Sequence, residues 1–193
     1  MYKKILASLA ALSVTCAAQS QETAFSYTYV DVGYIQGKAQ DYDAGGLRVA
    51  ASRAINRNVY ALASYTSVIT DDEFLIGATP DEQEYSELAF GFGFHTNMDE
   101  TPDFLAEVQY VKADADIGNQ NATGYRVAAG FRMPGGERFE VRTMINHTRL
   151  EGDRDTGFAL GGRARLGESS SLGLGYEKTL NLKAFSFDVR FEL

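Results

Sequence analysis

The sequence predicts an all-β protein, a closed antiparallel up-and-down transmembrane β-barrel that follows a cleaved signal peptide. Three observations lead to this prediction. The N-terminus has the order of basic, apolar and small residues that is typical of a secretion signal. Several later segments alternate large apolar residues with small or charged ones, which is the period of a β-strand. No later segment is apolar over enough residues to form a transmembrane helix.

The signal peptide is predicted over residues 1–20. Two lysines precede a short apolar run, and small residues follow this run up to the expected cleavage site after Ser20. Cleavage after Ala18 is the alternative. Either cut removes Cys16, which is the only cysteine of the chain. The mature barrel, predicted over residues 21–193, therefore has no disulfide, no catalytic thiolate and no cysteine metal site.

The composition favours a membrane barrel over a soluble sheet protein. The chain has 193 residues, with 19 Gly, 11 Tyr and 12 Phe beside only 3 Pro and no Trp. The mean hydropathy is −0.23, which suits a barrel because each strand turns only every second side chain to lipid. The net charge of −8 argues against nucleic acid as a partner.

The clearest predicted strand covers residues 86–96, where every second residue is large and apolar and the intervening ones are mostly small. The last segment, residues 184–193, repeats this pattern with charged residues opposite the aromatic ones. A period of two places alternate side chains on opposite faces, so the aromatic rows are expected to face lipid. The predicted lipid-facing residues include Leu88, Phe90, Phe92, Phe94, Phe131, Phe185, Phe187 and Phe191.

Ten strands are predicted in total. About ten residues rising roughly 3.4 Å each, tilted near 40°, cover on the order of 25 Å, which matches the apolar band of a membrane barrel. The hairpin after residue 172 is the least secure, and its loss would leave eight strands. For residues 59–68 the lipid-facing side is left open. The strands are expected around residues 30–34, 47–52, 59–68, 86–96, 106–111, 124–133, 139–146, 158–166, 172–177 and 184–193.

The links between these strands alternate in character. Four short links are rich in Asn, Pro, Gly or Ser and are predicted to be periplasmic turns. The intervening links are mostly longer or more polar and are predicted to face outside. An even strand count returns both termini to the periplasm. The short links are 55–58, 97–102, 134–137 and 168–170, and the others lie around 39–41, 70–83, 113–120, 150–154 and 178–182.

The faces opposite the apolar rows carry arginines and acids in nearly equal number. A barrel of about this size is narrow enough for side chains to fill, and an isolated charge away from water is costly. We therefore expect an ion-paired structural interior, with a narrow polar conduit as the alternative. The predicted lumen network consists of Asp31, Arg48, Glu87, Glu107, Arg126, Arg132, Glu140, Arg142, Arg163, Arg165, Glu177, Asp188 and Arg190.

No catalytic, cofactor or metal site is predicted. His95 lies beside a predicted periplasmic turn and His147 has lipid-facing parity, so both are expected to be interfacial residues. The link over residues 70–85 contains acids and no base, which makes divalent cations its candidate ligands. A solvated loop is the preferred interpretation, because the spacing of a calcium loop is missing. The acids are Asp71, Asp72, Glu73, Asp81, Glu82 and Glu84.

The signal, the alternating strands and a last strand that ends in Phe187, Asp188, Val189, Arg190, Phe191, Glu192 and Leu193 together resemble the small bacterial outer-membrane β-barrel proteins. This is the superfamily of the OmpA membrane domain and the OmpX and Ail proteins. The resemblance covers the whole mature chain, but it is one of pattern. It implies integration in the outer membrane of a Gram-negative bacterium, with membrane lipids and lipopolysaccharide as neighbours.

In that family the last strand ends in an aromatic residue and is read by the barrel-assembly machinery. Here the terminal residue is Leu193, with Phe191 two positions earlier on the same face. The family includes adhesins, serum-resistance proteins, small-solute channels and a few lipid A-editing enzymes, and the resemblance does not choose among them. We expect a structural or surface-interaction barrel with a largely filled lumen, and a narrow porin-like channel is the alternative.

Overall fold

The computed structural model describes residues 25–39, 42–70, 83–96, 102–115, 120–136, 138–179 and 182–193. The predicted signal peptide and the acidic residues 71–82 lie outside these ranges. The described chain forms ten β-strands. They are β1 (Tyr29–Ala39), β2 (Tyr42–Ala54), β3 (Val59–Thr70), β4 (Gln83–His95), β5 (Asp103–Ala115), β6 (Gln120–Pro134), β7 (Phe139–Leu150), β8 (Asp153–Arg165), β9 (Ser170–Lys178) and β10 (Leu182–Glu192).

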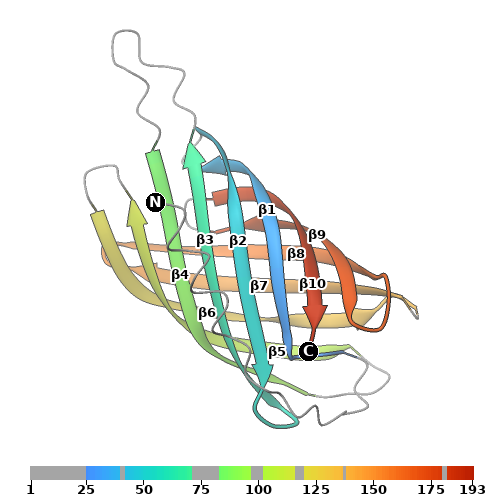
Figure 1. Cartoon of the computed structure of the whole chain (residues 1–193). Coiled ribbons are helices and arrows are strands. Elements are labelled where there is room, and N and C mark those ends of the chain that lie inside the picture. The colour runs from blue at the N-terminus through green and yellow to red at the C-terminus, as the bar shows by residue number, and fades with distance from the viewer. Residues whose placement is uncertain are drawn as a thin grey trace.

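The strands form one closed barrel in which each strand pairs antiparallel with its neighbours in sequence. The first and last strands close the ring, with Tyr29 opposite Glu192 and Ala39 opposite Leu182. In Figure 1 the strands β1–β4 run across the front of the barrel, while β7 and β8 cross behind them at a different inclination. The all-β barrel with ten strands is therefore confirmed.

The hairpin of β9 and β10 excludes the eight-strand alternative. The Thr179 amide donates to the Leu182 carbonyl over 2.8 Å and closes this turn. Tyr176 then lies opposite Phe185, and both rings are on the outer face, with centroids 5.0 Å apart. The outward apolar residues occupy even-numbered positions before this turn and odd-numbered positions after it. The turn between β9 and β10 explains this change.

The two ends of the barrel differ in their connections. At the end that we call the turn end, β2 and β3 are joined at residues 55–58, β6 and β7 at 135–138, and β8 and β9 at 166–169. Both ends of the described chain lie there, because the Leu193 amide donates to the Thr28 carbonyl over 3.1 Å. At the opposite, loop end, Gly152 adopts a φ of 91° in the two-residue link between β7 and β8. Tight hairpin links of this kind favour glycine because its φ can be positive.

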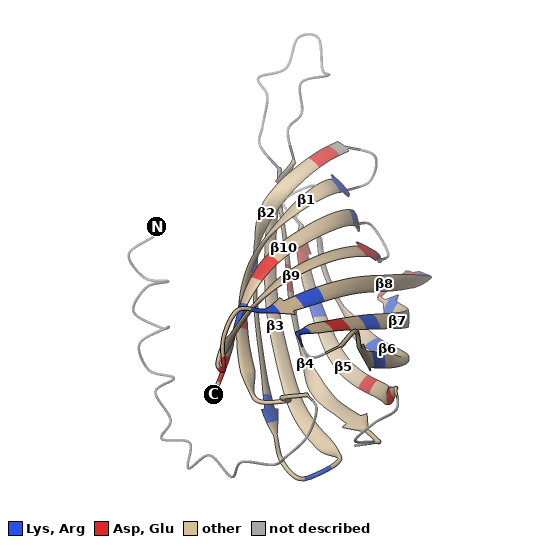
Figure 2. Ribbon diagram, turned by 90° about the vertical axis from the view of Figure 1, so that its right-hand side faces the viewer, with Lys and Arg blue, Asp and Glu red and all other residues tan. Residues whose placement is uncertain are grey.

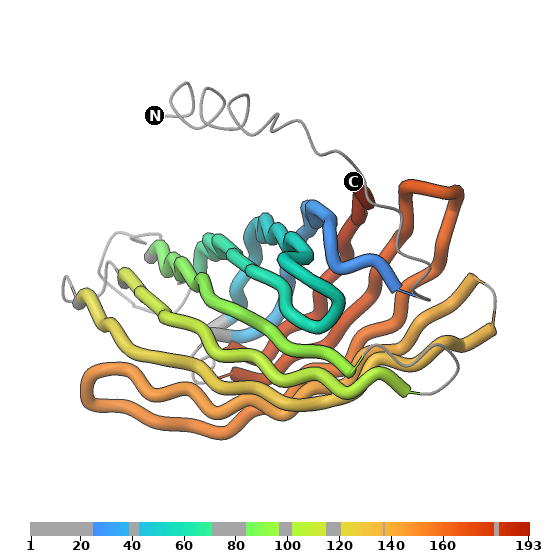
Figure 3. Tube along the Cα trace, turned by 90° about the horizontal axis from the view of Figure 1, so that it is seen from below, coloured from blue at the N-terminus to red at the C-terminus, as the bar shows by residue number. Residues whose placement is uncertain are grey.

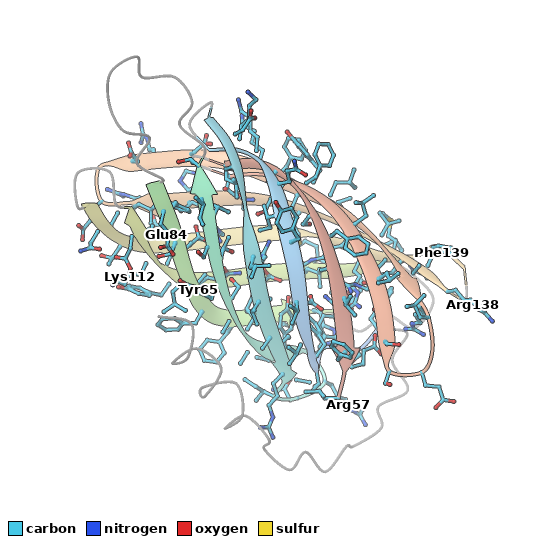
Figure 4. All side chains as sticks on the ribbon, turned by 45° about the horizontal axis from the view of Figure 1, so that its top comes forward. Arg57, Tyr65, Glu84, Lys112, Arg138 and Phe139 are labelled. Carbon is cyan, nitrogen blue, oxygen red and sulfur yellow. The ribbon has the colours of Figure 1, made fainter. Side chains whose placement is uncertain are left out.

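The outer face of the barrel is a wide apolar surface. All of the residues predicted to face lipid are exposed there, with Phe92 and Phe185 at 62% and 63%. Tyr65 also lies on this outer face, while Arg57 and Arg138 lie near the turn end and Glu84 and Lys112 near the loop end (Figure 4). So large an exposed apolar surface is not found on water-soluble monomers, and charged rims with an apolar band are typical of transmembrane barrels. The architecture is that of an outer-membrane β-barrel.

No helix among the described residues is long and apolar enough to cross a membrane.

The inner face is apolar towards both ends and charged between them. At the turn end, Phe25, Tyr27, Tyr60, Leu105 and Met144 form one buried cluster. Two further clusters lie on the inner face towards the loop end and share the ring of Tyr85. For β3, whose faces the sequence left open, Tyr60, Thr66 and Val68 are buried and Tyr65 is exposed, so the even-numbered residues face inward. The charged side chains of the lumen therefore sit between apolar layers.

Gly91 on β4 allows the neighbouring strand β5 to approach closely. A Cβ atom at this position would collide with the Val108 carbonyl and the Gln109 Cα, which are backbone atoms that cannot rotate away. At Gly161 on β8 the nearest such atom is the Leu174 carbonyl, at an ordinary 3.6 Å. We expect Gly91→Ala to lower the free energy of unfolding by roughly 1–3 kcal/mol through overpacking.

The matched control is Gly161→Ala, which should leave stability nearly unchanged. Urea titration of the refolded proteins, read by the heat-dependent gel mobility of the folded barrel, measures both. Equal midpoints for the two variants would contradict this account of the β4–β5 contact.

Candidate functional site

The lumen is the candidate site, because the strand registers place all of the predicted network residues on the inner face. Figure 2 shows the charged positions distributed over many strands and not collected on one of them. Arg165 differs from the rest, since it is exposed near the turn end of β8. The other members approach one another across the lumen.

Glu140 on β7 is the centre of the largest group of ion pairs. It accepts hydrogen bonds from Arg132 Nη2 at 2.6 Å and Nε at 3.2 Å. The guanidinium groups of Arg163 and Arg190 lie 3.6 and 3.8 Å from its other oxygen. One buried carboxylate thus holds three arginines from three strands, and removal of its charge would leave them with an excess of positive charge.

The same group continues around the wall to β1 and β10. Arg190 makes a bidentate contact with Asp31, at 2.7 and 2.8 Å, and its guanidinium lies 3.4 Å from the centre of the Tyr29 ring. Arg163 pairs with Asp188 and lies 3.6 Å from Asp31. We call this set of residues the ion-pair belt: Asp31, Arg132, Glu140, Arg163, Asp188 and Arg190.

Three further pairs join strands that are not neighbours in the barrel. Arg142 on β7 donates to Glu107 on β5 at 2.5 Å, and the Tyr60 hydroxyl from β3 donates to the same oxygen at 2.7 Å. Arg126 on β6 contacts Glu87 on β4 at 2.8 Å, and Arg48 on β2 contacts Glu177 on β9 at 3.0 Å. Each contact spans at least one intervening strand, so together they fix the relative position of strands that are not hydrogen-bonded to each other.

Residues 25–28, which precede β1, fold back into the turn end of the lumen. The side chains of Phe25 and Tyr27 are 4% and 7% exposed. The Arg132 guanidinium lies over both rings, 4.5 and 5.1 Å from their centres, and donates to the Ser26 carbonyl at 2.9 Å. Ser52 donates to the Tyr27 carbonyl at 2.8 Å. We call residues 25–28 the N-terminal plug.

Asp103, at the start of β5, fastens this plug. The Tyr27 hydroxyl donates to one of its oxygens at 2.5 Å, and His95 Nδ1 lies 3.2 Å from the same oxygen. The Thr96 amide and hydroxyl donate to the other oxygen at 2.8 and 2.9 Å. Burial raises the pKa of the Tyr27 phenol well above its usual value, so the phenol keeps its proton and remains a donor.

We did not predict the plug from the sequence, although the sequence contains a signal for this segment. Phe25 and Tyr27 continue the odd-numbered inner positions of Tyr29 and Asp31. Aromatic residues that precede the first strand and continue its inward-facing positions indicate a segment that packs inside the barrel. The segment was overlooked because its opposite positions, Ser26 and Thr28, are not apolar, so no strand pattern drew attention to it.

The expectation that His95 is interfacial is wrong. Its side chain is buried, and its ring stacks on that of Tyr27 with centroids 3.8 Å apart. It belongs to the fastening of the plug. His147 does lie on the outer face, where its Nδ1 is 3.0 Å from the Thr156 hydroxyl. Within the described ranges, His, Cys, Asp and Glu side chains form no group that could hold a metal ion.

A cavity of about 230 Å³ remains in the lumen above the plug. Its lining runs from Tyr29 and Glu140, beside the plug, to Thr179 just beyond the last residue of β9. Glycines of β8 and β9, among them Gly161 and Gly175, form part of the wall. Figure 3, which views the barrel along another axis, shows β1–β3 and β6–β8 as opposite walls. The lumen is therefore partly filled, with a chamber in its middle whose lining combines charged and apolar residues.

Comparisons with known proteins give a likeness of fold. No protein-family model and no curated protein matches the sequence. Among solved structures, neisserial surface protein A is 14% identical, with 87% of this chain and 98% of that chain covered and a TM-score of 0.46. The β-domain of the Bordetella autotransporter BrkA is 14% identical, with 87% and 100% covered and a TM-score of 0.49. The NanC porin is 11% identical, with 86% and 100% covered and a TM-score of 0.46.

Sequence identities and TM-scores of this size do not indicate the role of the protein. The membrane architecture rests on the barrel's own geometry, namely its closed ring, its exposed apolar band and its charged interior.

The position of Glu140 among three arginines predicts a large effect of its substitution. Glu140→Gln removes the negative charge that accepts hydrogen bonds from Arg132 Nη2 and Nε, and it weakens the contacts of residue 140 with Arg163 and Arg190. We expect the free energy of unfolding to fall by about 3–5 kcal/mol, the usual cost of breaking a buried ion pair. The control, Glu177→Gln, removes a carboxylate whose partner Arg48 is 35% exposed, so its effect should be clearly smaller. Similar losses in a urea titration would argue against the belt as the main electrostatic support.

The plug predicts a separate effect of the Tyr27 hydroxyl. Tyr27→Phe keeps the ring on His95 but removes the donor to buried Asp103, which should cost about 1–3 kcal/mol of stability. The control is Tyr65→Phe on the outer face, which should change stability little. Proteolysis near residue 25, followed by mass spectrometry, should show faster cleavage for Tyr27→Phe alone. Unchanged cleavage would mean that this hydrogen bond does not hold the plug.

Proposed function

We propose that this protein is an integral outer-membrane barrel with a closed lumen, which acts as a structural or surface-interaction protein and not as an enzyme. The single observation that carries this proposal is the N-terminal plug. Phe25 and Tyr27 occupy the turn end of the lumen and are held there by Arg132, Asp103 and Ser52. A solute passing through the barrel would have to displace buried rings and their hydrogen bonds.

The ion-pair belt supports the same conclusion. It lies next to the plug and joins β1, β6, β7, β8 and β10 by charged side chains that are mostly buried. Buried ion pairs are costly to separate, because each charge would lose its partner in surroundings of low polarity. The plug therefore closes the turn end, and the belt narrows the lumen beside it.

The proposed partners follow from the outer surface. Membrane lipids and lipopolysaccharide would cover the exposed apolar band and its charged rim. The barrel-assembly machinery would read β10, whose outward residues include Phe187 and Phe191, together with the exposed Leu193 that follows it. Export through a Sec-type signal over residues 1–20 and divalent cations at the acidic link belong to the same proposal.

A narrow channel for small solutes or ions is the second candidate. The observation that favours it is the cavity of about 230 Å³, which extends from the plug to Thr179 and has both charged and apolar residues in its lining. A conduit would then require only that the plug leave the turn end.

Planar-bilayer recording of the refolded mature chain tests the proposal. We expect no reproducible conductance steps from protein whose folded state is verified by heat-dependent gel mobility. The matched variant combines Phe25→Ala and Tyr27→Ala, and it should give small steps because the cavity then reaches the turn end. Steps from the unsubstituted chain would overturn the closed-lumen proposal and support the channel. If neither protein gives conductance steps, the belt and not the plug closes the lumen.

A further inference from the structure

Three lysines lie side by side on the outer face at the loop end of the barrel. Lys38 on β1 is directly opposite Lys183 on β10, and Lys183 is directly opposite Lys178 on β9. Figure 2 shows basic positions at the adjacent ends of β1 and β10. Side chains directly opposite each other on one face of a sheet are about 5 Å apart at Cβ, and like charges in such pairs are destabilising. We call these three residues the lysine row.

Acidic side chains compensate the lysine row only in part. The carboxylate of Asp43, which is directly opposite Lys38 on β2, lies 3.7 Å from Lys38 Nζ. Their side chains are 82% and 57% exposed, so this ion pair is weak. For Lys178 and Lys183, no carboxylate among the described residues lies within 4 Å. The three lysines and the one acid have a net charge of +2, which favours an anion with about two negative charges.

A groove on the outer face begins at the lysine row. It has a volume of about 400 Å³ and is lined by residues of β1, β2 and β10. Along β1 its outward residues are Lys38, then Gln36, then Tyr34, and Phe185 lines it from β10. The groove therefore passes from charged to apolar side chains in the direction of the membrane. This order matches a lipid, whose charged head group is followed by an acyl chain.

A second pair of like charges lies on the outer face without contributing to this groove. Arg149 on β7 and Arg154 on β8 are directly opposite each other near the loop end, and both are exposed. Neither of them lines the groove. Long basic side chains at a membrane interface commonly extend towards the head groups without selecting one lipid. The two arginines represent that general behaviour, whereas the lysine row combines charge with a shaped apolar surface.

We propose that the lysine row and the groove bind one membrane lipid whose head group is a phosphate monoester. The phosphate contacts the three lysines, and an acyl chain lies along the groove against Tyr34 and Phe185. A phosphate monoester carries nearly two negative charges at neutral pH, which matches the net charge of the site. Its oxygens accept charge-assisted hydrogen bonds from several ammonium groups at once. A phosphodiester or zwitterionic head group has less negative charge and fits less well.

This inference rests on the proposed membrane environment of the outer face, because a membrane lipid is what brings a head group and an acyl chain to it. It does not rest on a closed lumen. A refolded chain without heat-dependent gel mobility would overturn both the membrane barrel and the lipid site. A folded barrel without the lipid preference described below would overturn the lipid site alone.

Native mass spectrometry of the refolded mature chain, released from detergent micelles at about pH 8, tests the site above the second pKa of a phosphate monoester. The probes are phosphatidic acid, phosphatidylglycerol and phosphatidylcholine with the same acyl chains, and glycerol 3-phosphate without any chain. We expect one equivalent of phosphatidic acid to bind about tenfold more tightly than the other two lipids. Equal binding of the three lipids would overturn the proposal. Equal affinity for glycerol 3-phosphate would show an anion site and not a lipid site.

Two double variants separate the lysine row from general positive charge. Lys178→Gln combined with Lys183→Gln should weaken the binding of phosphatidic acid about tenfold, because two exposed ionic contacts are lost. Arg149→Gln combined with Arg154→Gln removes the same number of charges from two adjacent strands and should leave this binding unchanged. Equal losses in both variants would mean that the lipid follows the overall charge of the rim, which would contradict the site.

Gly45→Phe tests the groove without altering a charge. A Cβ atom at Gly45 would come within 2.6 Å of the Tyr34 hydroxyl, the free end of a side chain that can rotate, and the new ring would fill the groove. Phosphatidic acid should then bind several-fold more weakly. The control is Gly162→Phe on the outer face of β8, where the nearest atom is 4.0 Å away and lipid binding should not change. Full binding of phosphatidic acid by folded Gly45→Phe would disprove the acyl-chain assignment.

Discussion

The pairing of long charged side chains across the lumen is the interaction on which the other features of this barrel depend. The closed ring satisfies the backbone hydrogen bonds between its strands, and its outer face is apolar. Charged side chains that point inward therefore pair mainly with side chains of other strands. Two sets of contacts provide such partners: Glu140 contacts three arginines, and Arg142 contacts Glu107. Together they join β5, β6, β7, β8 and β10. The same contacts fix the positions of strands around this side of the ring, and these positions help to determine how much space remains in the lumen.

The glycines of the inner face are part of this arrangement. At Gly173 a Cβ atom would meet the carboxylate of Asp188, which pairs with Arg163. At Gly93 it would meet the ring of Tyr60, which donates to Glu107. A small residue on one strand therefore makes room for a large polar side chain on the next. The charged side chains can pack densely because the glycines on the neighbouring strands have no side chain at these positions.

The sequence was sufficient to predict the strands and, except for β3, their faces, because parity is a local property. Phe90 and Phe92 face the same way whatever the rest of the barrel does. Which charges meet could not be predicted in this way. Arg48 reaches Glu177 across two intervening strands, and that depends on the tilt and stagger of the whole ring. The plug was missed for a related reason, since Tyr27 and His95 are brought together by barrel closure and not by spacing along the chain.

The two halves of the lumen serve different physical needs. At the turn end, Phe25, Tyr27 and Arg132 combine ring contacts with hydrogen bonds, so closure there depends on one short segment. In the middle, the side chains of Arg48 and Arg142 are 35% and 36% exposed, more than those of the belt arginines. Arg190, by contrast, donates to both oxygens of Asp31. Belt residues line the same cavity, so the contacts that hold the barrel together also form part of the wall of its chamber.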